Sequence, residues 1–204
     1  MNKKFKILII ILILILIPVV YFTATTVSNQ MEQDNFYETI KNVSNAENKS
    51  DKLIAEYIQN NSNNYTFLMD NYNQTIKTMD DSINTLKDLN KSLHNETLKE
   101  YVNLEITRIE DEKTQWKIIP EEIEVLENYY HGKSSFSESY QKIKELNDEI
   151  NKTGTIVVHD KEKAEEFLED HPDIKTRFEK LGIDEDFRIV ENAEVDKKIA
   201  KSKK

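Results

Sequence analysis

The feature that most constrains this chain is a run of apolar residues spaced at alternating steps of four and three between Val27 and Asn151. This is the heptad pattern of helices that pack side by side along a seam. The clearest seam makes eight consecutive correct steps through Tyr65, Met69, Tyr72, Ile76, Met79, Ile83, Leu86, Asn90 and Leu93. A helix with such a seam needs at least one partner helix, so we expect a helical bundle.

Three other seams keep the same spacing, and a cluster of Asn and Ser at residues 60–64 predicts a chain reversal between the first two. The earliest seam has a polar centre and is expected to be the looser helix; it comprises Phe36, Ile40, Val43, Glu47, Ser50, Ile54 and Tyr57. The third comprises Leu98, Val102, Glu105, Ile109, Glu112, Trp116, Ile119, Ile123, Leu126 and Tyr130. The fourth comprises Phe136, Tyr140, Ile143, Asn147 and Ile150.

Two local signals refine these helices. Pro120, followed by two glutamates, is typical of a helix start, but the third seam crosses it in phase, so we favour a kink or a very short break. Ser135 and Glu138 have the spacing of a capping box, which predicts the start of the fourth helix. Helices of about thirty residues span about 45 Å. Residues 28–152 are therefore predicted to form an elongated antiparallel bundle of three or four helices.

The pattern changes in residues 153–196, which predict a small β-α-α-β unit. Strands are expected at residues 155–159 and 187–191, because both runs are rich in β-branched or aromatic residues. Between them we expect a helix capped by Asp160 and a second helix that begins at Pro172. Two strands alone are marginally stable, so this unit is expected to pack on the bundle or on a second copy.

The chain contains only three Gly and three Pro, and it has no Cys. Gly132, Gly154 and Gly182 each stand where a helix is expected to end, which predicts left-handed C-caps. The composition excludes a dinucleotide-binding turn, a glycine-rich phosphate loop, a disulfide and a thiolate metal site. Residues 197–204 form a basic tail that we expect to be frayed.

Residues 1–27 favour a membrane segment, because three lysines precede sixteen uncharged, mostly aliphatic residues at 7–22. Its length lies between that of a signal-peptide core and that of a spanning helix. We favour an uncleaved single-pass anchor, since the bulky Phe22 spoils a cleavage site at Ala24; cleavage would make the protein secreted. The positive-inside rule places the N-terminus in the cytoplasm and the rest outside the cell membrane.

Eight Asn-x-Ser/Thr sequons occur, roughly three times the number that composition predicts. One of the eight, Asn90, also lies on a seam, where a buried Asn can fix register and oligomeric state. The other seven are candidate glycosylation sites if the host has the machinery: Asn42, Asn48, Asn60, Asn64, Asn73, Asn95 and Asn151.

The net charge is −10, and residues 25–196 carry all 38 acidic but only 20 of the 28 basic residues. A surface this acidic disfavours nucleic acid as a partner, because phosphate binding needs a basic face. The remaining partner expectations are the membrane, a protein partner and a second copy of the chain.

Catalytic groups are sparse, so we predict neither an enzyme nor a metal or cofactor. The four histidines show no spacing that would place two on one helix face; they are His94, His131, His159 and His171. The acidic runs at residues 110–112 and 121–124 are typical of a solvated helix face. An enzyme with its site in residues 155–191 would require His159, His171, Asp160 and Asp186 to cluster.

The leading prediction for function is a non-enzymatic, membrane-anchored, extracytoplasmic helical protein that presents an interaction or structural surface, with the β-α-α-β unit as its expected location. The alternative is an extracytoplasmic ligand-sensing bundle that acts through a membrane partner or by dimerising. A cavity would favour sensing, and the aromatic residues expected to line it are Tyr65, Tyr72, Trp116 and Tyr140.

Overall fold

A computed structural model of the protein describes residues 26–50, 52–53 and 65–183. They form an N-terminal helix over residues 26–50, with 52–53 also helical. It is followed by α2 (Tyr65–Ser92), α3 (Glu96–Tyr130), α4 (Phe136–Asp170) and α5 (Pro172–Leu181). The described residues contain no strand, so the prediction of a mainly α fold is confirmed for this part of the chain.

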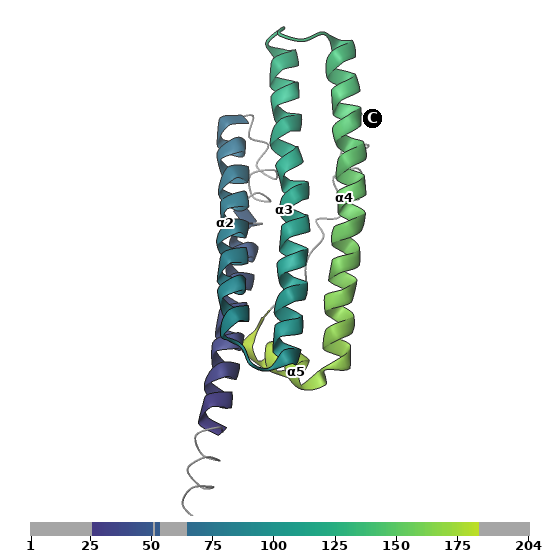
Figure 1. Ribbon diagram of the computed structural model, residues 1–204. Coiled ribbons are helices and arrows are strands. Elements are labelled where there is room, and N and C mark those ends of the chain that lie inside the picture. The colour runs from purple at the N-terminus through teal and green to yellow at the C-terminus, as the bar shows by residue number, and fades with distance from the viewer. Residues whose placement is uncertain (1–25, 51, 54–64, 184–204) are drawn as a thin grey trace, which may run out of the picture.

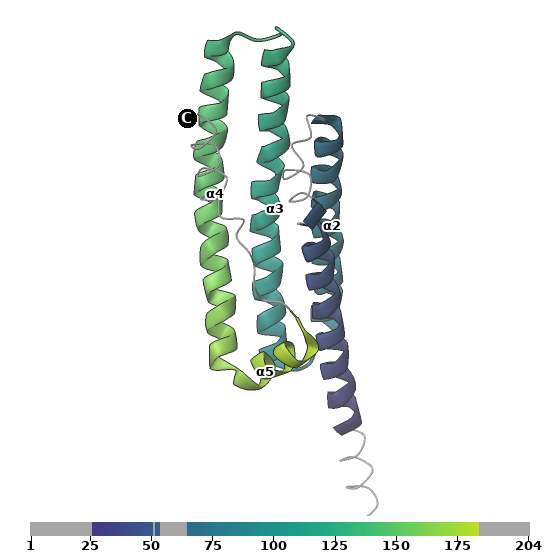
Figure 2. The same cartoon turned by 180° about the vertical axis from the view of Figure 1, so that it is seen from behind.

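The long helices run antiparallel and make an elongated bundle. Figure 1 shows α2, α3 and α4 in a row, and α3 in the middle packs against both neighbours. Seen from behind, the N-terminal helix lies along α2 (Figure 2). The short helix α5 crosses the end of the bundle where the N-terminal helix begins, whereas α3 and α4 extend beyond α2 at the opposite end (Figure 1).

The core is densest next to α5, where aromatic side chains from four helices meet. Phe36 of the N-terminal helix stacks on Phe178 of α5, with ring centroids 6.1 Å apart. Tyr101 of α3 contacts Phe178 at 5.2 Å and Phe167 of α4 at 5.5 Å. Because these rings are almost fully buried, they fix the relative positions of the elements at this end.

The turn between α2 and α3 is tied to the N-terminal helix. The backbone amides of His94 and Asn95 both donate to one carboxylate oxygen of Glu32, that of Asn95 at 2.7 Å. Asn95 also caps α3, because its side-chain oxygen accepts a hydrogen bond from the Leu98 amide at 3.2 Å. These contacts join segments more than sixty residues apart in the sequence.

The first three predicted seams largely face the bundle interior. Buried members of the first two seams are Phe36, Ile40, Val43, Ser50, Tyr72, Met79, Ile83, Leu86 and Leu93. In the third seam they are Leu98, Val102, Glu105, Ile109 and Ile123. The third seam departs from the prediction at its end, where Tyr130 is exposed.

Pro120 lies inside α3, and the helix continues through it to Tyr130. Of the two outcomes predicted, a kink or a very short break, the structure excludes the break, because α3 is one helix across Pro120. The seam explains why: Ile119 and Ile123 on either side both contact the small core around Tyr72. Packing on both sides of the proline stabilises helical backbone that lacks one amide donor.

The predicted β-α-α-β unit is wrong in its first half. Residues 155–159 are helical and belong to α4, which runs without a break through Gly154. Asp160 does not cap a helix but lies within α4. Packing of α4 on α3 outweighs the strand preference of a short β-branched run, since Val157 is buried in the helical phase.

The predicted fourth seam is only partly right, because Ile143 and Ile150 are half-buried but Phe136, Tyr140 and Asn147 are exposed. The inner face of α4 contains these two isoleucines and continues from them in its own steps of four and three. Its members are Ser139, Ile143, Leu146, Ile150, Thr153, Val157, Asp160, Ala164 and Phe167, all buried or half-buried. Polar residues at three of these positions hide the seam in the sequence.

Helix termini follow the sequence signals at four of five positions. Ser135 and Glu138 form the predicted capping box, and α5 begins at Pro172 as expected. Gly132 and Gly182 have φ of +68° and +64° directly after helices, so both are left-handed terminators as predicted. Gly154 is the exception, because it is helical.

Several predictions concern residues outside the described ranges. They are the membrane segment, the reversal at 60–64, the second strand at 187–191 and the basic tail at 197–204. Among the described residues, no helix combines the length and apolarity required to cross a membrane.

Candidate functional site

The connection between α3 and α4 is a tight turn held by backbone and capping hydrogen bonds. Gly132 donates its amide to the Tyr129 carbonyl at 3.0 Å, and the Lys133 amide reaches the Asn128 carbonyl at 2.8 Å. Ser135 then starts α4, and its backbone amide and hydroxyl donate to Glu138, which lowers the pKa of that carboxyl. Because both helix ends are satisfied locally, this turn holds its flanking side chains in fixed positions.

Four aromatic side chains surround this turn, and we call them the aromatic tip: Tyr129, Tyr130, Phe136 and Tyr140. All four are exposed, Tyr130 to 71% and Phe136 to 67%. The rings form a chain of contacts. The ring centroid of Tyr129 lies 5.7 Å from that of Tyr130 and 6.1 Å from that of Phe136, and Phe136 stacks on Tyr140 with centroids 5.9 Å apart. A contiguous exposed aromatic patch is typical of an interaction surface.

Polar residues border the aromatic tip. His131 and Lys133 are exposed in the turn, and the Ser134 and Ser139 hydroxyls are 2.7 Å apart beneath it. An apolar centre with a polar rim resembles the anatomy of protein–protein interfaces, whose centres are enriched in Tyr, Trp and Phe. The tip also lies at the end of the bundle away from the start of the N-terminal helix (Figure 1).

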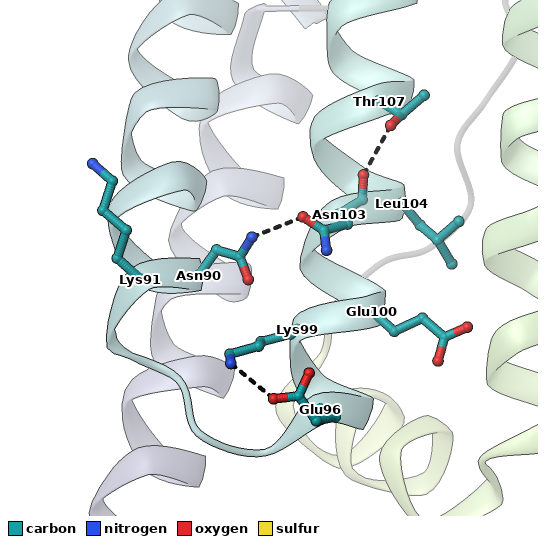
Figure 3. A pocket seen from close by; sticks show the side chains of 8 residues that line it. All are labelled: Asn90, Lys91, Glu96, Lys99, Glu100, Asn103, Leu104 and Thr107. Atoms are coloured by element: carbon teal, nitrogen blue, oxygen red, sulfur yellow. Dashed lines mark hydrogen bonds and ion pairs between the residues drawn. The ribbon is translucent and has the colours of Figure 1, made fainter.

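A second surface feature is an open groove beside the α2–α3 turn, shown in Figure 3. Asn90 of α2 donates to the Asn103 side-chain oxygen of α3 at 2.7 Å, and Lys99 pairs with Glu96 at 2.8 Å. Four of its polar side chains are thus paired with one another, and Lys91 pairs with Asp88 outside the groove. Asn90 is half-buried on its seam and bridges two helices, and its role in register stays a prediction.

The candidate glycosylation sites lie in different settings. Asn42, Asn73 and Asn151 are exposed on helices, and Asn48 is half-buried on the N-terminal helix. Asn60 and Asn64 lie outside the described residues. Asn95 is exposed in the turn between α2 and α3, the surface-loop setting expected of an acceptor.

The structure does not bring the predicted cavity residues together. Tyr72 and Trp116 pack against each other at 5.4 Å, and burial raises the pKa of Tyr72 to about 12. Tyr140 instead belongs to the exposed tip, and the Tyr65 side chain is outside the described set. In the part of the chain described, two of the four residues therefore fill space in the core.

The candidate catalytic residues are scattered. His159 is exposed and lies 3.7 Å from Glu162, while His171 stacks on Phe167 at 4.1 Å. Asp160 is buried beside Lys163 at 2.9 Å, and Asp186 is outside the described residues. Within the described ranges, no group of His, Asp and Glu is arranged to hold a metal ion.

A group of paired charged side chains lies inside the bundle, around Arg108 of α3. The guanidinium is only 2% exposed, and each of three carboxylates lies 2.8 Å from one of its nitrogens. Glu105 and Glu112 come from α3, and Glu47 comes from the N-terminal helix. We call these four residues the arginine cluster. Its carboxylates raise the pKa of Arg108 despite the opposing effect of burial.

Glu47 has a pKa well above that of an ordinary carboxyl. Burial raises its pKa to about 7, against the attraction of Arg108 and with added repulsion from Glu112 and Glu105. Glu47 was expected only to loosen its helix, yet it joins that helix to α3.

Sequence reasoning missed both the aromatic tip and the arginine cluster. Three of the tip aromatics, Tyr130, Phe136 and Tyr140, were assigned to seams because they keep heptad spacing. The cluster had a detectable signal, since Glu47, Glu105 and Glu112 all occupy seam positions and Arg108 follows Glu105 by one turn. Polar residues on adjacent seams indicate that they pair with each other.

Comparison with protein-family models, with curated proteins and with solved structures finds no match to this chain. Functional inference therefore depends on the residues and their geometry alone.

Proposed function

We propose that this chain is a single-pass, membrane-anchored, extracytoplasmic protein without enzymatic activity that presents the aromatic tip to a protein partner. The observation that carries the proposal is the contiguous, exposed cluster of four aromatic rings at the α3–α4 turn. Such rings form the energetic centres of many protein interfaces because they bury large area with few rotatable bonds.

The position of the tip supports the same proposal. The apolar run in residues 7–22 would anchor the chain just before the N-terminal helix. That helix begins at the end of the bundle opposite the aromatic tip (Figure 1). A helix of 35 residues such as α3 spans about 52 Å, so the bundle would hold the tip well away from the bilayer.

The interaction function is favoured over ligand sensing by the packing of the core. Tyr72 and Trp116, which were expected to line a ligand cavity, occupy the interior through contact with each other. The predicted location of the surface has also moved, because residues 155–159 belong to a long helix rather than to a separate unit.

Topology can be tested by cysteine labelling, since the natural chain has no Cys to interfere. We expect Asn147→Cys, at an exposed position on α4, to react with a membrane-impermeant maleimide in intact cells. Lys3→Cys is the matched control and should react only after permeabilisation. Labelling of Lys3→Cys but not Asn147→Cys in intact cells would reverse the proposed topology.

The tip is tested by photo-crosslinking in the same cells. A photoreactive amino acid at Tyr130 should give a discrete protein adduct, and the same group at Asn147 should not. The adduct should disappear in Phe136→Ser/Tyr140→Ser, while the melting temperature changes little because both side chains are exposed. Equal products from positions 130 and 147, or an adduct that survives the double substitution, would contradict the assignment of the tip.

A further inference from the structure

Among the described residues, three buried side-chain oxygens lack a hydrogen-bond donor: Glu47 Oε1, Glu105 Oε1 and Asp160 Oδ2. All three belong to carboxylates. An ionised carboxylate oxygen that gives up water without gaining a donor is costly, so buried carboxyls often retain a proton instead.

Two of these oxygens belong to neighbouring groups. Oε2 of Glu47 and Oε2 of Glu105 both lie 2.8 Å from the same nitrogen, Nη2 of Arg108. The Glu105 side chain is only 6% exposed. A proton on Glu47 would remove its negative charge, so that its unpartnered oxygen would no longer be part of a buried carboxylate.

The balance of charge at this level of the bundle also favours a proton. Arg108 supplies one positive charge for three carboxylates, since its Nη1 binds Glu112 at 2.8 Å. The α2 lysine and aspartate at this level, Lys87 and Asp80, pair with Glu110 and Lys113 on α3. The charged groups that α4 contributes here are Asp160, Lys161 and Lys163, of which Lys163 pairs with Asp160.

We propose that Glu47 carries a proton within the arginine cluster, and that this proton is part of what holds the N-terminal helix on α3. The cluster is thus a proton-binding site between two helices. The part of the chain described holds no group fitted for a metal ion, and the guanidinium already occupies the centre of the cluster.

The proton is released near neutral pH. Burial is the main cause that raises the pKa of Glu47, to about 7, and repulsion from Glu112 and Glu105 adds to it. Release leaves two adjacent buried carboxylates on different helices, with one guanidinium nitrogen between them. Their repulsion weakens the contact of the N-terminal helix with α3, and that helix is the element that follows the apolar run at residues 7–22.

The first test follows the carboxyl carbons of the full-length, unmutated chain by ¹³C NMR during a pH titration. We expect the Glu47 carboxyl to titrate with a midpoint near pH 7. Titration of Glu47 near its ordinary value of 4.5 would overturn the proposal. This readout needs no substitution and so does not depend on a variant that folds.

The second test asks whether the proton holds the helix. Backbone amide exchange of residues 36–50, measured above and below the midpoint, should rise several-fold on deprotonation beyond the intrinsic pH effect. In Glu47→Gln, whose amide imitates the protonated carboxyl, this excess rise should disappear. Glu38→Gln, at an exposed position on the same helix, is the matched control and should keep it.

An excess rise that persists unchanged in Glu47→Gln would overturn the role of Glu47. Asp111→Asn separates the other coupled carboxyls, because burial and a hydrogen bond to Asp160 raise the pKa of Asp111. If the excess rise is lost in Asp111→Asn and kept in Glu47→Gln, the effect belongs to Asp111 and Asp160, and the proposed role of the Glu47 proton is rejected.

Discussion

At the scale of single residues, Arg108 has the largest expected effect on stability. It is buried and binds carboxylates from two helices. Its own desolvation opposes folding, so the cluster is not a simple stabilising ion pair. Removing the guanidinium alone, however, leaves three carboxylates in a buried site with their main counter-charge gone.

We therefore expect Arg108→Met to lower the free energy of unfolding by about 3–5 kcal/mol at neutral pH. The loss should be smaller in mild acid, where a protonated Glu47 reduces the uncompensated charge. Urea unfolding at neutral pH and in mild acid measures this loss of free energy. Arg177→Met is the control, since Arg177 is exposed and lies 5.7 Å from the Tyr37 ring, a contact worth about 1 kcal/mol or less. Equal losses in the two variants would refute the special position of Arg108.

Glu47 predicts a specific dependence of stability on pH. Its pKa is about 7 when folded and 4.5 as an ordinary carboxyl. Between these values the folded state binds more protons than the unfolded state, so the contribution of Glu47 to stability falls as pH rises through this window, by on the order of 3 kcal/mol. In Glu47→Gln this fall should vanish, which makes the variant more stable than the natural chain above about pH 7. Unfolding curves measured between pH 4.5 and pH 7 test whether stability falls with rising pH and where it falls. Glu38→Gln is the control and should show the same fall as the natural chain.

At the scale of elements, α4 shows where sequence reasoning succeeds and where it fails. Its start was predictable because Ser135 and Glu138 form a local hydrogen-bonded motif. Its inner face was not, because Ser139, Thr153 and Asp160 occupy seam positions that only the structure identifies as buried or half-buried. Because the seam was assigned from apolar residues alone, it included Phe136 and Tyr140. These two side chains belong to the exposed tip and not to the inner face.

Gly154 illustrates the same limit. A glycine after two polar residues looks like a helix terminator, but whether a helix ends there depends on the tertiary contacts that follow. Val157, Ala164 and Phe167 all pack inward beyond it, so the helix continues. Gly132 was predictable because the capping box of Ser135 and Glu138 starts a new helix just after it.

Substitution of these glycines gives opposite expectations. Gly154→Ala should stabilise the protein by about 0.5–1 kcal/mol, because alanine is the better helix residue and its Cβ would meet only the flexible end of Gln115, at 3.1 Å. Gly132→Ala should destabilise it by about 1 kcal/mol, since alanine is strained at φ +68° even though the space around it is open. Thermal unfolding of both variants provides the comparison. A stabilising Gly132→Ala would show that the turn does not need its left-handed residue.

At the scale of the whole molecule, α3 and α4 together make a hairpin that extends beyond α2 and ends in the aromatic tip (Figure 1). Heptad spacing along both helices means that the packing repeats every seven residues, about 10.5 Å. Duplicating residues 121–127 in α3 and 139–145 in α4 should therefore lengthen the molecule by about 10 Å while the seams stay in phase. Small-angle scattering measures the maximum dimension. Duplicating residues 121–127 alone is the control, and it should lower the melting temperature because α4 then lacks a matching partner.

The steps of four and three that define the seams thus have a consequence beyond stability. The number of heptads sets how far the hairpin reaches, and the few residues at the turn set what it recognises. Reach and recognition are encoded in separate stretches of sequence, so either can vary in evolution or in design while the other is kept. A chain of this kind acts as a spacer of adjustable length with an exchangeable end.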